Sequence, residues 1–168
     1  SNPDSALNLL DSGFTFITKP EASPLQLVNY YTNKSLVFRE LNNKDQELKI
    51  LFEAKAIALE YPYLPYLEAL VNLNLANYYN FYYQPDFAKF YAEAANQFFQ
   101  KNNEYREYAE SLFELSNVYL TKENYLKTIY LLQEAIADTR LRNDTFSLVR
   151  ALSDLSYSLN AVGQYQKG

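Results

Sequence analysis

The sequence predicts an all-α protein, a right-handed α-solenoid of antiparallel helix pairs with about eight helices. A Leu-small-x-x-large pattern recurs about every 40 residues. A second pattern, small-x3-large-x2-small, lies between its copies, and only 3 Gly and 6 Pro in 168 residues favour long helices over a turn-rich β fold. Such self-similarity is typical of repeat proteins, whose units bury their apolar faces against their neighbours. The first pattern reads Leu75-Ala76-x-x-Tyr79, Leu115-Ser116-x-x-Tyr119 and Leu155-Ser156-x-x-Leu159.

Helix boundaries follow from proline and from breaks in the apolar periodicity. Pro3, Pro24, Pro65 and Pro85 mark helix starts, because proline at the first position of a helix loses no hydrogen bond. The periodicity breaks at Asn-rich and Pro-containing segments, at 42–43, 61–62, 102–103, 122–124 and 143–144. The predicted helices are 3–17, 24–41, 45–60, 64–82, 86–100, 105–121, 125–141 and 145–161.

Two helix types alternate in this series. The A type carries the Leu-small-x-x-large pattern, with a weaker copy around Ser35, and the B type carries the small-x3-large-x2-small pattern. A small residue lets two helix axes cross closely, so we expect Ala76, Ser116 and Ser156 to lie at helix crossings. The B-type copies are Ala6/Leu10/Gly13, Glu47/Leu51/Ala54, Ala88/Ala92/Ala95 and Thr128/Leu132/Ala135.

The helix order B, A-B, A-B, A-B, A defines one repeat array over residues 1–168. Its units are expected at about 1–22, 23–62, 63–103, 104–143 and 144–168. The first and last units hold one helix each, so we expect this sequence to be a piece of a longer array, unless the first helix is a cap.

Composition excludes several functions. A net charge of −5 and a pI near 4.8 oppose binding to nucleic acid. The sequence has no Cys and no His, which removes disulfides, thiolate nucleophiles, the usual general base and the commonest metal ligands. Gly-rich phosphate loops and the Gly-x-Ser-x-Gly motif are also absent from the sequence, so we expect no enzyme, no cofactor and no metal.

Membrane insertion is not expected of this segment. The longest uncharged run, 69–85, contains four asparagines, which would be costly in lipid. The composition suits the bacterial periplasm and the cytoplasm equally.

The repeat resembles the tetratricopeptide family, whose units are helix–turn–helix pairs with the motif W-x2-L-G-x2-Y followed by A-x3-F. Tryptophan is replaced throughout, and the period is 40–41 residues instead of about 34. Long-period members of the family are similar to sensory regions of bacterial transcription regulators and sensor kinases, as is the opening segment 3–11. The resemblance implies a protein- or peptide-binding domain with a sensory or scaffolding role in a bacterial signalling protein. The match is best at Leu112, Leu115, Ser116, Tyr119, Tyr125, Thr128, Leu132 and Ala135.

In this family the A helices line a concave groove, which gives candidate site residues by their distance from the crossing residues. Asn77 and Asn117 occupy equivalent places and offer amides to the main chain of an extended peptide, although asparagine is common throughout this chain. Glu110 and Arg150, also equivalent, either hold the charges of a ligand or pair with each other. The predicted groove residues are Leu73, Asn77, Asn80, Glu110, Phe113, Asn117, Arg150, Tyr157 and Asn160.

Two further clusters have competing interpretations. Glu107, Glu110 and Glu114 share one helix face, for which a solvated acidic surface is favoured over a cation site. The aromatic residues within 78–83 cannot all face one side of a helix, so some must be exposed. These aromatics either pack between helices or stack on a ligand, which leaves carbohydrate or small-molecule binding as the alternative function. Self-association is a third possibility.

Overall fold

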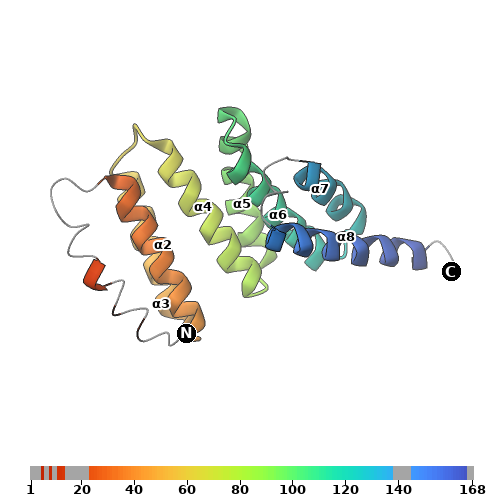
Figure 1. Cartoon of the computed structure of the whole chain (residues 1–168), viewed down its shortest axis with the longest axis horizontal. Helices are drawn as coiled ribbons and strands as arrows, with labels where there is room; N and C mark the ends of the chain where they lie inside the picture. Colours follow the sequence, from red (N-terminus) through yellow and green to blue (C-terminus); the bar gives the residue numbers. More distant parts are fainter. Residues whose placement is uncertain (1–4, 6–7, 9–10, 14–22, 138–144, 166–168) are drawn as a thin grey trace. The chain divides into compact units, whose positions relative to one another are not determined.

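The computed structural model describes residues 5, 8, 11–13, 23–137 and 145–165 (Figure 1). The described residues are helical apart from short connections, and none of them forms a strand. The all-α prediction is therefore confirmed; the predicted helix 3–17 lies largely outside the described residues. The helices are α2 (Pro24–Glu40), α3 (Lys44–Leu59), α4 (Pro65–Phe81), α5 (Pro85–Asn102), α6 (Tyr105–Thr121), α7 (Tyr125–Ala137) and α8 (Thr145–Tyr165).

The predicted helix starts are confirmed at three prolines. Pro24, Pro65 and Pro85 are the first residues of α2, α4 and α5. Ser23 forms a capping box in front of α2: its Oγ accepts a hydrogen bond from the Gln26 N–H at 3.2 Å, and its own N–H donates to Gln26 Oε1 at 2.8 Å. These contacts satisfy N–H groups that the first turn of a helix leaves without partners.

Asparagine ends two of the helices, as the sequence predicts. Asn42 and Asn103 adopt left-handed backbone conformations, with φ of 55° and 58°, which asparagine tolerates better than most residues. Tyr83 and Glu123 adopt the same conformation after α4 and α6. Each of these left-handed residues turns the chain from one helix into the next.

The contacts divide the chain into two compact units, Ser1–Asn74 and Leu75–Gly168, with the boundary inside α4. In the first unit, α2 packs against α3. In the second unit, α5 packs against α6, α6 against α7, and α7 against α8. The division into five repeat units stays a prediction from the sequence.

In the first unit a carboxylate occupies a position where the repeat has a small residue. Glu47 is fully buried on α3. Its Oε1 accepts hydrogen bonds from Arg39 Nε at 2.8 Å and Nη2 at 2.6 Å. A buried carboxylate is strongly unfavourable unless it is paired, so Arg39 on α2 makes this departure from the repeat pattern tolerable.

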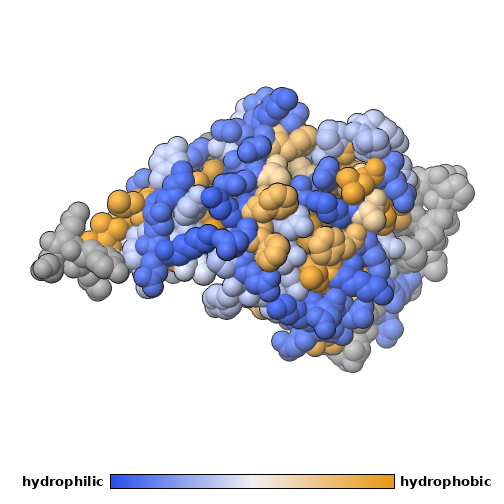
Figure 2. All heavy atoms as spheres, turned by 180° about the vertical axis from the view of Figure 1, so that it is seen from behind, coloured by the Kyte–Doolittle hydropathy of each residue, from blue (hydrophilic) through white to orange (hydrophobic). Residues whose placement is uncertain are grey.

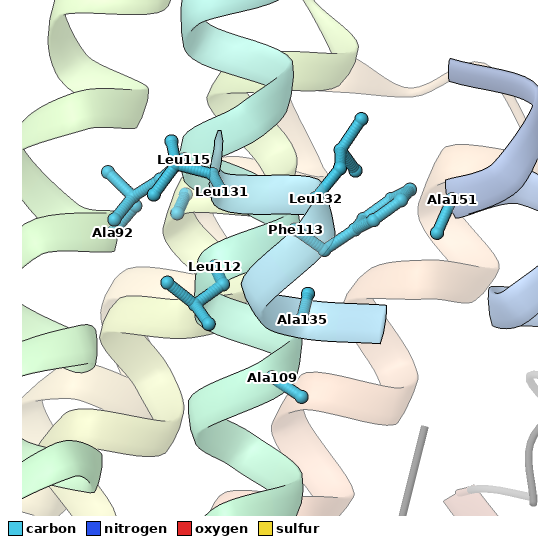
Figure 3. Packing of buried hydrophobic residues seen from close by; sticks show 10 residues of the cluster. Ala92, Ala109, Leu112, Phe113, Leu115, Leu131, Leu132, Ala135 and Ala151 are labelled. Carbon is cyan, nitrogen blue, oxygen red and sulfur yellow. The ribbon is translucent and has the colours of Figure 1, made fainter. Parts of the chain in front are cut away.

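The core of the second unit follows the repeat pattern (Figure 3). The small residues Ala76, Ala92, Ala135 and Ser116 are all buried, as is the large residue Leu132. Figure 3 shows Leu115 beside Ala92 of α5, and the Phe113 ring pointing towards Ala151 of α8. The small and large positions of the repeat therefore form one packed cluster.

Crossing residues are confirmed at two of the three predicted places. Ala76 and Ser116 are buried, with 0% and 1% of their surfaces exposed. The prediction for Ser156 is wrong, because this residue is exposed on α8. Its equivalent Ser116 is buried on α6, next to Leu115 of the cluster to which α7 contributes, whereas no helix of the described residues covers Ser156.

Apolar side chains also reach the surface. On the face drawn in Figure 2, hydrophobic residues gather in patches between hydrophilic ones. None of the helices in the described part of the chain is both long and apolar enough to cross a membrane.

Candidate functional site

The candidate site is a surface of the second unit. It is formed by the A-type helices, which are the C-terminal part of α4, the helix α6 and the helix α8. We call it the A-helix surface. Contacts between side chains tie these helices together, from α4 to α6 and from α6 to α8. Leu73 was also predicted to lie here; it is about as buried as Phe113 and belongs to the first unit, so its part in the site stays a prediction. The A-helix surface comprises Asn77, Asn80, Glu110, Phe113, Glu114, Asn117, Arg150, Tyr157 and Asn160.

A buried carboxylate joins α4 to α6. Glu114 is only 6% exposed. Its Oε1 accepts a hydrogen bond from Asn77 Nδ2 at 2.9 Å. Asn80 Nδ2 donates to Glu114 Oε2 at 2.6 Å and to the Glu114 backbone oxygen at 2.9 Å. Two of the predicted groove amides, those of Asn77 and Asn80, therefore form intramolecular hydrogen bonds. They supply the partners that the buried Glu114 carboxylate needs.

Glu114 does not belong to a solvated acidic face, contrary to the interpretation from the sequence. The sequence does contain a signal, because Asn77 and Asn80 lie on the preceding A helix, 37 and 34 residues before Glu114. Amides so placed can reach a carboxylate across neighbouring helices. Among the described residues no group of Asp and Glu is arranged to hold a metal ion.

Arginine and phenylalanine connect α6 to α8. The Arg150 guanidinium lies over the Phe113 ring, with its central carbon 4.5 Å from the ring centroid. Such a cation–π contact contributes about 0.5–1 kcal/mol at an exposed site. Glu110 Oε1 lies 3.3 Å from Arg106 Nε, one turn earlier on the same helix. These contacts hold the charges of Glu110 and Arg150 at the A-helix surface.

The other predicted residues are more open. Asn117 lies one turn after Phe113, and its side-chain amide makes no hydrogen bond to any described residue. Tyr157 of α8 is 59% exposed and meets Tyr125 edge to face, with ring centroids 6.2 Å apart. Asn160 lies one turn further along α8 and is exposed. Because residues three and four apart share a helix face, these groups extend the surface beyond Phe113 and Arg150.

Asp154 is the repeat equivalent of Glu114, one period later. It is half-buried on α8, and burial raises the pKa of Asp154 above its usual range, while the nearby charge of Arg150 opposes this shift. Among the residues that the structure describes, no amide pair like Asn77 and Asn80 binds Asp154, because position 120, one period after Asn80, is a leucine. The amide–carboxylate contact is therefore not repeated at the next helix.

The aromatic cluster divides between core and surface. Tyr78 and Tyr79 are buried, whereas Phe81 and Tyr83 are exposed, as the helix geometry requires. Tyr79 stacks on Tyr91 of α5, with centroids 5.6 Å apart and the rings nearly parallel. Packing between helices accounts for the buried half of the cluster.

A separate cleft of about 330 Å³ lies between α5, α6 and α7. Tyr108, Tyr119 and Tyr130 line it together with amides and charged groups. The Tyr108 hydroxyl donates to Glu134 Oε1 at 2.5 Å and accepts from Gln100 Nε2 at 3.2 Å. Burial, followed by this hydrogen bond to Glu134, raises the pKa of Tyr108, so the hydroxyl stays protonated. The sequence analysis did not find this cleft, since its lining comes from three helices.

Comparison with known proteins identifies the fold. The chain is similar to the crystal structure of BtubC (BKLC) from P. vanneervenii, with a TM-score of 0.77 and 18% identity over 98% of this chain and 68% of that one. It is also similar to a putative kinesin light chain from Podosopora anserina with nearly identical TPR-like repeats, with a TM-score of 0.66 and 17% identity over 98% of this chain and 81% of that one. No family model and no curated protein matches the sequence. The fold is a tetratricopeptide-like helical repeat.

Proposed function

We propose that this chain binds an extended peptide segment of a partner protein on the A-helix surface of its second unit. The proposal rests on one observation. Side chains that are held in place by contacts within the protein lie beside polar and aromatic side chains that are accessible to a ligand. Glu114 and Arg150 are held by their contacts with α4 and α6. Asn117, Tyr157 and Asn160 remain open to a ligand. A rigid surface with open polar and aromatic groups lowers the entropic cost of binding.

The open groups suggest how a peptide would be bound. The Asn117 amide offers two donors and one acceptor, which suit the C=O and N–H groups of an extended main chain. Tyr157 offers an aromatic face to a side chain of the ligand, and Arg150 offers the cationic contact. Asn77, by contrast, binds Glu114, so the expected ladder of asparagines is reduced to Asn117 with Asn160.

Peptide binding is tested by selecting ligands from a peptide library and measuring their dissociation constants. The Asn117→Ala plus Tyr157→Ala variant is expected to bind roughly 10- to 100-fold more weakly, because it loses a hydrogen bond and an aromatic contact. The matched control is Asn33→Ala plus Tyr63→Ala, which removes the same two side-chain types from exposed places in the first unit. Equal weakening by both variants would place the ligand elsewhere.

A role in bacterial signalling is the finer form of this proposal. It is supported by the period of about 40 residues and by the opening segment 3–11, both similar to sensory regions of bacterial regulators. The peptide would then act as the signal, or as the docking segment of a partner. Sequencing the gene from which the chain comes tests this role. A kinase or helix-turn-helix region on the same polypeptide supports it, and an unrelated output contradicts it.

The cleft between α5, α6 and α7 favours a second candidate function, the binding of a neutral polyhydroxylated small molecule. Three tyrosines, amides and charges of both signs line it, and its volume of about 330 Å³ falls at the small end of known ligand pockets. Titration with a panel of mono- and disaccharides, followed by NMR, is expected to perturb residues of the cleft. Tyr130→Ala should weaken this binding several-fold, whereas Tyr83→Ala, which removes an exposed tyrosine that does not line the cleft, should leave it unchanged.

A further inference from the structure

Helices α6 and α8 contact each other in the same register as α4 and α6. Asn77 of α4 donates to Glu114 of α6, which follows it by 37 residues. The Phe113 ring of α6 contacts the Arg150 guanidinium of α8, and this pair has the same separation of 37 residues. Positions of neighbouring A helices that differ by this separation therefore lie opposite each other, as expected of a repeat.

The same register brings the amide of Asn117 on α6 opposite the carboxylate of Asp154 on α8. Yet neither side chain forms a hydrogen bond to any residue that the structure describes. The side chain of aspartate is one methylene shorter than that of Glu114, so its carboxylate falls short by about 1.5 Å, the length of one C–C bond. Leu120 also replaces the second amide, that of Asn80. The direct contact that joins α4 to α6 is therefore not made between α6 and α8.

Asp154 lies on the side of α8 that packs against the rest of the second unit. Ala151 and Ser158, one turn before and one turn after it, are fully buried, and Asp154 itself is half-buried. Burial raises the pKa of Asp154, as expected for a carboxylate that no donor stabilises, although the charge of Arg150 opposes the shift. The donor is missing for a reason contained in α6 and α8 themselves, namely the short aspartate and the leucine at position 120.

The charges around Asp154 favour a cation as its partner. The Arg150 guanidinium lies on the Phe113 ring, and among the described residues it forms no ion pair with Asp154. An ammonium group has three donors, which suit the two carboxylate oxygens and Asn117 Oδ1. Helices α6 and α8 together carry more carboxylates than cations: the carboxylates are Glu107, Glu110, Glu114 and Asp154, and the cations are Arg106 and Arg150.

We infer that Asp154 and Asn117 together bind a lysine or arginine side chain of the peptide, so that the site selects ligands with a basic residue at one position. The inference rests on the proposed peptide site and adds the chemical class of the residue that this site selects. The cationic group lies between the Asp154 carboxylate and Asn117 Oδ1, and Asn117 Nδ2 still donates to the peptide main chain. Asp154 is a specificity-determining residue that the sequence analysis did not include in the groove.

Peptides selected from a random-sequence library on the wild-type chain provide the probes. Each lysine or arginine of the tightest-binding peptide is replaced in turn by methionine. Dissociation constants are then measured by fluorescence anisotropy against wild type and Asp154→Asn. One of the replacements is expected to weaken binding roughly tenfold, as is Asp154→Asn, because each removes a charge-assisted hydrogen bond. Both changes together should weaken binding no further than either alone, since they remove the same contact.

The Asp154→Glu variant tests the geometry at constant charge. The added methylene should let the carboxylate reach the Asn117 amide, as Glu114 reaches Asn77. Peptide binding should then weaken several-fold, and the Asn117 side-chain amide signals should shift in the NMR spectrum of the ligand-free chain. The matched control for Asp154→Asn is Asp45→Asn, which removes an exposed aspartate charge from α3 in the first unit and should leave binding unchanged.

The outcomes separate this inference from the proposed function. Coupling between Asp154 and one basic residue of the peptide supports the inference. Selected peptides without a basic residue overturn it, as does binding that Asn117→Ala plus Tyr157→Ala weakens and Asp154→Asn does not; in both cases the peptide site itself stands. Equal weakening by Asp154→Asn and Asp45→Asn indicates a long-range charge effect and also overturns it. Failure of the library to yield any ligand overturns both the inference and the proposed function.

Discussion

Replacing both Asn77 and Asn80 by alanine is expected to lower the free energy of unfolding by roughly 2–4 kcal/mol. These amides donate the hydrogen bonds to the Glu114 carboxyl group, at 2.9 and 2.6 Å. Without them Glu114 would remain buried with no donor, and a buried polar or charged group without a partner is more costly than the lost bonds alone. Chemical denaturation followed by circular dichroism measures this loss.

The control for this prediction removes amides that are open. Asn117→Ala plus Asn160→Ala should change the free energy of unfolding by less than about 0.5 kcal/mol, since neither amide has a partner in the described residues. Adding Glu114→Leu to the Asn77→Ala plus Asn80→Ala variant should restore part of the stability, because no unpaired carboxyl group is then left in the interior. Equal stability of the Asn77/Asn80 variant and wild type would show that water replaces the amides around Glu114.

Replacing Ser116 by leucine is expected to cost about 1–3 kcal/mol of stability through overpacking. Ser116 is 1% exposed on α6, and its hydroxyl donates to the Phe113 carbonyl oxygen at 2.7 Å. A leucine side chain has two more heavy atoms than serine, for which the crossing has no room, so neighbouring helices would have to move apart. Thermal unfolding followed by circular dichroism measures the effect.

The same substitution one period later supplies the control. Ser156→Leu places an identical change at the equivalent position of α8, where the serine is exposed, and its effect should stay within about 0.5 kcal/mol. Ser111, by contrast, is fully buried and accepts a hydrogen bond from Asn96 Nδ2 at 3.0 Å, so it is unsuitable as an exposed reference. If Ser116→Leu and Ser156→Leu lower the stability equally, a close helix crossing does not explain why position 116 is a small residue.

The helices, and the positions at which close packing requires small residues, could be predicted from the sequence. Proline at positions 24, 65 and 85 and asparagine at 42 and 103 mark boundaries through local backbone preferences, which act before any tertiary contact forms. The burial of Ala76 and Ser116 follows from the repeat, because equivalent positions of successive units lie at equivalent helix–helix contacts. Both kinds of information are contained in short stretches of chain.

The sequence did not show which polar groups of the A helices bind to other groups of the protein and which remain open, because this depends on tertiary contacts. Asn77 and Asn117 look equivalent in the sequence, yet the Asn77 amide donates to Glu114 while the side-chain amide of Asn117 has no partner among the described residues. Ser116 and Ser156 look equivalent too, yet one is buried and the other exposed. The physical reason is the same in both cases: burial and pairing depend on the neighbouring helix, and a repeat pattern specifies a helix without specifying what packs against it.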